Sequence, residues 1–221
     1  MKLRRMVWLV ISPLLILLTG CGDQPPAEEP CNFVQNKASR RVSWAQTPIR
    51  FYADDSISNV QFHDIREAME VWNKLFDRPV FELIGRTNQL PDPVLGDDGR
   101  MAPDSFNGIY VVDASAFENT SQRDEQARTS ISFRGDFIYE ADILIDASEN
   151  LHFEDPTEVN QKRFSGAKIH FKSLMVHELG HVLGLDHIDD VEGSVMDSRL
   201  EQGEFRVEIA EVDAASLACE Y

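Results

Sequence analysis

Basic residues are scarce in this sequence: 21 lysines and arginines stand against 38 aspartates and glutamates, and the formal net charge is −17. Three of the basic residues, Lys2, Arg4 and Arg5, lie within residues 1–20, so a chain without that segment has 18 basic and 38 acidic residues, a balance of −20. A protein this acidic repels phosphate groups. The composition therefore argues against binding to nucleic acid or to anionic lipid headgroups.

Long hydrophobic runs are lacking as well, apart from residues 6–18 near the start. A short apolar run behind basic residues is typical of an export signal rather than of a membrane span. It ends in Leu18-Thr19-Gly20-Cys21, which resembles the lipobox of bacterial lipoproteins and implies cleavage before Cys21 and its diacylation. The alternative is an ordinary secretory signal with an incidental cysteine. We expect a signal peptide at 1–20 and an exported protein held on the membrane by lipid at Cys21.

The cell envelope of a bacterium is the expected location, and the outer membrane or cell surface is favoured because Gly22, not Asp, follows Cys21. Residues 21–47 show no apolar periodicity, and 23–30 are rich in proline and acid, which predicts a flexible tether. The remaining residues, 48–221, are numerous enough for one sizeable domain. No internal repeat is visible.

One stretch of eleven residues has the spacing of a metal site: residues 177–187 follow the pattern H-E-x-x-H-x-x-G-x-x-H. On a helix, His177 and His181 lie one above the other, where two imidazoles can bind one Zn²⁺ at about 2.0–2.1 Å. Gly184 suits the end of that helix, so the chain can turn and bring His187 back as a third ligand. Three protein nitrogens leave one position open for water, as in catalytic zinc sites. Glu178 then lies beside the metal. A histidine pair at this spacing also occurs by accident, but the five fixed positions favour a zinc site.

With the segment 194–197 (Ser-Val-Met-Asp), the motif resembles the zinc-binding helix and Met-turn of the metzincin metalloproteases, most closely the matrixins. The resemblance implies that the zinc ligands are His177, His181 and His187. It implies that Glu178 activates a zinc-bound water as general base, and that Met196 lies beneath the metal; the alternative is an ordinary core methionine. Two features depart from the family: no tyrosine follows shortly after Met196, and the Pro-x-Tyr segment of the matrixin substrate pocket is missing.

Only three cysteines are present, and Cys31 and Cys219 remain once Cys21 is assigned to the anchor. A pair of cysteines in an exported protein usually forms a disulfide, so we predict a Cys31–Cys219 bond. The alternative is a cysteine switch, in which Cys31 is a thiolate on the zinc, although the matrixin switch motif is absent around it.

Apolar periodicity predicts strands at 49–52, 80–84, 108–113, 127–133 and 140–146, and helices at 58–76, 165–183 and 212–218. With the resemblance, this implies an α+β, metzincin-like zincin fold: a twisted sheet of about five strands, an active-site helix and a small C-terminal lobe. Segment 127–133 is expected to be the edge strand of the cleft, where an extended peptide substrate can add as another strand. The alternative is an edge strand without a partner.

Four aspartates of one loop and a further histidine are also considered as metal-site residues. Asp92, Asp97, Asp98 and Asp104 lie in the long loop 85–107, and loops here bind Ca²⁺ in matrixins, but their spacing matches no defined calcium loop. A solvated acidic loop is the alternative. His170 lies seven residues before His177 on roughly the same helix face, and we interpret it as a residue behind the ligands or as solvated.

The sequence therefore predicts a zinc endopeptidase that hydrolyses peptide bonds of extracytoplasmic proteins through a zinc-bound water activated by Glu178. Two alternatives stay open. One is a catalytically silent, zinc-containing binding lipoprotein of the cell envelope, and the other is a structural envelope lipoprotein with adventitious metal.

Overall fold

The computed structural model describes residues 31–96, 99–117, 125–147, 151–152 and 168–221. The predicted signal peptide, Cys21 and residues 21–30 lie outside the described residues. Asp97 and Asp98 lie outside them too.

A six-stranded sheet forms the frame of the fold, in the order β1-β6-β4-β2-β3, with β5 paired to β6. The strands are β1 (Ser43–Trp44), β2 (Ile49–Asp54), β3 (Phe81–Thr87), β4 (Gly108–Val112), β5 (Ala127–Arg134) and β6 (Phe137–Asp146). β6 pairs in parallel with β4 and with β1, and it pairs antiparallel with β5 from Ala127↔Ile145 to Arg134↔Phe137. β5 therefore forms an edge of the sheet, next to the strand that is buried on both faces.

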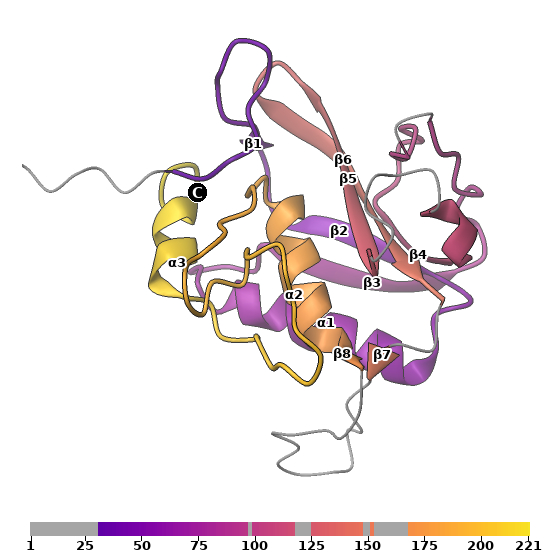
Figure 1. Ribbon diagram of the computed structural model, residues 1–221. Coiled ribbons are helices and arrows are strands. Elements are labelled where there is room, and N and C mark those ends of the chain that lie inside the picture. Colours follow the sequence, from indigo (N-terminus) through magenta and orange to yellow (C-terminus); the bar gives the residue numbers. More distant parts are fainter. Residues whose placement is uncertain (1–30, 97–98, 118–124, 148–150, 153–167) are drawn as a thin grey trace, which may run out of the picture.

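Two helices cover one face of this sheet: α1 (Asn59–Asn73) and α2 (Phe171–Val182), which pack against each other (Figure 1). Ser58 caps α1, because its hydroxyl accepts from the Gln61 N–H while the Gln61 side chain accepts from the Ser58 N–H. The Trp72 indole N–H donates to the Val176 carbonyl at 2.9 Å and joins the two helices through the core. Among the described residues, no helix is long and apolar enough to cross a bilayer.

The smaller elements are a 3₁₀ turn (Ala114–Ala116), the short parallel pair β7 (Leu151–His152) and β8 (Ile169–His170), and the closing helix α3 (Glu211–Leu217). The predicted start of the active-site helix near Ser165 was wrong. Residues 169–170 are extended and paired with β7, so the helix begins only at Phe171. The predicted fold class is confirmed: a mixed sheet with few helices, in which β1 is one strand more than expected.

The predicted tether is wrong for residues 31–47. Phe33 and Val42 are buried, and β1 pairs with β6, so the folded domain includes this segment rather than starting at Pro48. The proline- and acid-rich composition ends at Pro30, and the apolar residues that follow find places in the core. We name residues 31–34 the N-terminal strap, because they run across the loop that follows α2.

Candidate metal centre and active site

Helix α2 ends in a turn that only glycine accommodates. The Gly184 N–H donates to the His181 carbonyl at 2.9 Å and the Leu185 N–H donates to the Gly180 carbonyl at 3.1 Å, which is a Schellman arrangement. Gly184 has φ +94°, and a Cβ there would lie 2.4 Å from the Val42 carbonyl oxygen. The turn reverses the chain and returns His187 toward the helix, as expected from the position of Gly184.

Three imidazoles meet at the end of this turn. The Nε2 atoms of His177 and His181 are 3.0 Å apart, those of His181 and His187 are 3.0 Å apart, and those of His177 and His187 are 3.3 Å apart. Among the described residues, these three form the one group of histidine, cysteine or acidic side chains close enough to hold a metal ion. Two ligands at about 2.0–2.1 Å in a tetrahedral site are about 3.3–3.4 Å apart, so the spacing is near that of a zinc centre.

Hydrogen bonds on the other ring nitrogen fix which atom of each helix histidine faces the centre. His177 Nδ1 donates to the Val195 carbonyl and His181 Nδ1 donates to the Leu185 carbonyl, both at 2.8 Å. In a neutral imidazole the remaining Nε2 is then an acceptor only. Acceptor atoms 3.0 Å apart repel each other unless a cation lies between them. The donor set therefore fits a bound metal ion.

Burial keeps the helix imidazoles neutral, as metal ligation requires. Loss of hydration lowers the pKa of His181 to about 4 and holds the pKa of His177 well below its usual range, and the neighbouring imidazoles act in the same direction. A proton therefore does not compete with a metal at these two nitrogens near neutral pH.

Glu178 lies beside the imidazoles with its side chain buried. Its Oε2 accepts from the Thr129 hydroxyl of β5 at 2.6 Å. Burial raises the pKa of this carboxyl to about 7, while the hydrogen bond from Thr129 opposes the rise. Such a carboxyl can both accept and return a proton near neutral pH, and a cation bound next to it would favour the ionised form.

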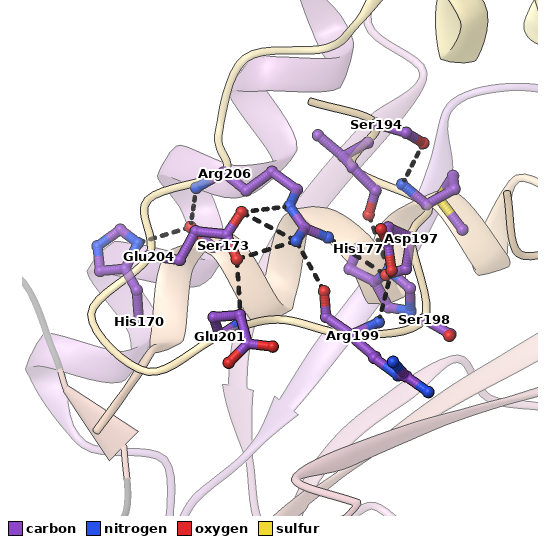
Figure 2. Close-up of polar contacts among 12 residues, drawn as sticks. His170, Ser173, His177, Ser194, Asp197, Ser198, Arg199, Glu201, Glu204 and Arg206 are labelled. Carbon is purple, nitrogen blue, oxygen red and sulfur yellow. Dashed lines mark hydrogen bonds and ion pairs between the residues drawn. The ribbon is translucent and has the colours of Figure 1, made fainter. Parts of the chain in front are cut away.

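Met196 lies in a buried turn beneath α2, and the carboxylate of Asp213 in α3 holds that turn. Asp213 accepts from the Ser194 hydroxyl at 2.7 Å and from the Val195 N–H at 2.9 Å. The Ser194 hydroxyl in turn accepts from the Met196 N–H at 3.1 Å (Figure 2). Because the Val195 carbonyl receives the His177 Nδ1–H, α3 orients the first histidine through this turn.

The N-terminal strap holds the loop that carries the third histidine. The Asn32 side-chain amide donates to the Asp186 and His187 carbonyls, both at 2.7 Å, and the Asp186 N–H donates back to the Asn32 carbonyl. The predicted disulfide between Cys31 and Cys219 is present and ties the strap to the second residue after α3. The alternative in which Cys31 binds the zinc does not fit this bond.

An open cleft of about 1040 Å³ leads to the imidazoles. One side is the edge strand β5, including Ala127, Thr129 and Ile131, and the other is the loop 197–206 that follows the Met196 turn. Arg206 holds this loop: its guanidinium pairs with Glu204 and donates to the carbonyls of Asp197 and Arg199 (Figure 2). The loop 197–206 follows Met196, where the Pro-x-Tyr segment of the matrixins is missing, and it forms this wall of the cleft.

His170 is buried rather than solvated. Its Nδ1 lies 2.7 Å from the Ser173 hydroxyl, and the same hydroxyl accepts from the Arg206 N–H at 2.7 Å (Figure 2). The His170 ring packs on Phe205. It supports the loop 197–206 from behind and is not part of the histidine cluster. The acidic loop residues likewise form no metal group among the described residues. The N–H of Asp104 donates to Glu140 instead.

Four residues that the sequence did not single out shape the site: Thr129, Asp213, Arg206 and Asn32. Thr129, Asp213 and Asn32 contact residues far away in the sequence, and the Arg206 guanidinium joins residues of one irregular loop, so no periodic pattern indicates these four. Only Thr129 leaves a trace, as a polar residue at an inward position between Ala127 and Ile131.

The family model described as Matrixin matches residues 104–221, which hold β4, β5, β6, the histidine cluster, the Met196 turn and α3. No curated protein matches the chain. The matched region covers more than half of the sequence and includes both sides of the cleft. The chain belongs to the matrixin family of metzincins.

Proposed function

We propose that this protein is a zinc-dependent endopeptidase that hydrolyses peptide bonds of extracytoplasmic proteins. The observation that carries the proposal is the convergence of the three Nε2 atoms with the buried Glu178 carboxylate beside them, in a cleft that is open to solvent. Membership of the matrixin family supports zinc as the metal and peptide hydrolysis as the reaction.

In this proposal His177, His181 and His187 hold the zinc, which supplies a Lewis acid that polarises the peptide carbonyl and lowers the pKa of a water molecule. Glu178 removes a proton from the attacking water and then gives it to the leaving amine. A cation beside Glu178 favours the ionised carboxylate that the first transfer needs, and burial, which raises the pKa of this carboxyl, favours the protonated form that the second transfer needs. Met196 and Gly184 have structural roles, as the floor of the site and the end of the helix.

The substrate binds in this proposal as an extended chain along β5. This strand pairs with β6 on one side, and its residues 127–129 and 131 line the cleft. An edge strand offers main-chain N–H and C=O groups to any extended peptide. The peptide backbone would therefore be recognised whatever its side chains are.

Export and a lipid anchor at Cys21 complete the proposal, on the evidence of the sequence alone. An anchored enzyme meets proteins outside the cytoplasm, and the net charge of −17 supports attachment by acyl chains rather than by a basic surface. Radiolabelled fatty acid should then be incorporated into the full chain and not into a Cys21→Ala variant.

The function is tested with Glu178→Gln, which removes the base and leaves the imidazoles. Purified wild-type protein should bind one zinc per chain and digest unfolded casein, a chelator should stop the digestion, and zinc should restore it. Glu178→Gln should keep the zinc and lose activity by at least about 10²-fold. Glu70→Gln, an exposed position on α1, is the matched control and should cleave normally.

The other outcomes separate the alternatives. Full zinc loading without cleavage of any protein by the wild type would favour the silent binding lipoprotein. Zinc well below one per chain would favour the structural lipoprotein with adventitious metal.

A further inference from the structure

The inward face of β5 contains one polar residue. Ala127 and Ile131 pack on the hydrophobic core against α2, and Thr129 lies between them. Its hydroxyl oxygen is 2.6 Å from Glu178 Oε2 and 3.1 Å from the Glu178 carbonyl oxygen. An unbonded hydroxyl on an otherwise apolar strand face costs free energy. This hydroxyl is bonded, and its partner is the carboxylate that the proposed reaction uses.

We propose that Thr129 is a positioning residue that holds the Glu178 carboxylate in its catalytic orientation, an inference that rests on the proposed peptidase function. The terminal torsion of a glutamate is broad and roughly two-fold, so burial alone does not fix which way the two oxygens point. The Thr129 hydroxyl engages Oε2. In this proposal Oε1 is the oxygen left to take the proton from the attacking water.

The charged neighbours of Glu178 do not supply this orientation. Glu125 and Arg128 act on it through space and with opposite signs, and they form an ion pair with each other. Arg128 also donates to the Gly99 carbonyl and lies over the Phe117 ring. A short bond from a β-branched side chain, whose own χ1 is restricted, is the more rigid restraint.

The location of Thr129 links substrate binding to the base. Thr129 pairs with Ile143 of β6, at the third of the eight positions of the β5 register. A peptide that adds to the outer edge of β5 would be placed relative to the same residue that holds Glu178. One strand would thus set both the position of the scissile carbonyl along the cleft and the orientation of the Glu178 carboxylate. A misplacement of about 1 Å in such a pair costs about 10²-fold in rate.

The test is Thr129→Val, which keeps the shape of the side chain and removes the hydroxyl. We expect kcat on a peptide substrate to fall about 10- to 100-fold while KM changes less than about twofold, since backbone pairing is retained. Thr129→Ser should recover most of the lost kcat. Thr87→Val, the same substitution on the opposite edge strand β3, should leave kcat and KM unchanged.

A second readout does not depend on activity. Crystal structures of the zinc-loaded variants should show the Glu178 carboxylate rotated or in several conformers in Thr129→Val, and in the wild-type orientation in Thr129→Ser, with one zinc per chain in both. Should Thr129→Val fold poorly, Thr129→Ala serves for both measurements, because it also lacks the hydroxyl.

The two proposals fail differently. If the wild type cleaves peptides and Thr129→Val keeps the wild-type kcat, or its Glu178 stays in place, the positioning role is overturned and the peptidase stands. If the wild type cleaves nothing, the peptidase fails, and the orientation of Glu178 in the variant structures still decides whether Thr129 holds it.

Discussion

Met196 occupies the space that a side chain at position 180 would need. A Cβ built on Gly180 would lie 2.3 Å from the Met196 sulfur and 3.1 Å from the Trp72 ring. The buried turn and α2 therefore touch through a glycine in the helix segment between His177 and His181. This contact sets how closely the floor of the site approaches the histidines.

Gly180→Ala should be destabilising, although alanine favours helices over glycine by about 1 kcal/mol. The added methyl group must displace Met196 or the helix, and overpacking of this kind costs about 1–3 kcal/mol. Urea unfolding and zinc titration should both show the loss. In a double-mutant cycle with Met196→Ala the cost of Gly180→Ala should shrink. Undiminished stability and zinc affinity in the single variant would show that the contact is unimportant.

Asp213 should be required for a stable Met196 turn. Replacement by alanine leaves the buried Ser194 hydroxyl and Val195 N–H without their acceptor, so we expect a loss of about 2–4 kcal/mol in the free energy of unfolding. Zinc should also bind less tightly, because the Val195 carbonyl orients His177. Glu211→Gln, an exposed change at the start of α3, is the control and should be neutral. A normal zinc affinity in Asp213→Ala would separate the turn from the metal site.

The sequence predicts local features of the fold better than long-range ones. The capped, periodic helix α1 and the ligand motif with its glycine turn follow from neighbouring residues, and both are present. The bond between Thr129 and Glu178 and the hold of Asp213 on Val195 join segments that are far apart, so no periodicity indicates them. The sequence predicts a tether at residues 31–34, because a segment that packs on a loop shows no regular spacing of apolar residues.

Asn32 should strengthen zinc binding without touching the metal. Its side chain bonds the carbonyls of Asp186 and His187, and each such bond contributes about 0.5–1.5 kcal/mol. Asn32→Ala should therefore weaken zinc affinity by up to about tenfold, measured with a competing chelator. Asn36→Ala, which removes bonds to the β5–β6 hairpin instead, is the matched control. Equal affinities in the two variants would mean that the strap does not hold the third histidine.

Asp142 should make the protein less stable as pH rises. Its side chain is buried, and burial, helped by the charges of Asp104 and Glu140, raises its pKa to about 7. Between pH 3.8 and 7 the folded protein keeps a proton that the unfolded chain releases. The contribution of Asp142 to the free energy of unfolding therefore falls as the pH rises through that window, and it is lost above pH 7.

Asp142→Asn keeps an oxygen acceptor for the Gly108 N–H and removes the ionisation. The variant should gain stability relative to wild type between pH 5 and pH 8, by an amount on the order of a few kcal/mol. Glu178 is present in both proteins, so its own titration cancels in the difference. A stability difference that stays constant with pH would mean that Asp142 ionises normally in the folded protein.

The central claim is that three imidazoles bind one zinc and leave a position for solvent. X-ray absorption spectroscopy of the zinc-loaded protein tests it most directly. The account predicts one zinc per chain with three histidine nitrogens and one further light atom at about 2.0–2.1 Å, and a His187→Ala variant with one histidine fewer and much weaker binding. A sulfur ligand at about 2.3 Å, or an unchanged zinc shell in His187→Ala, would contradict it.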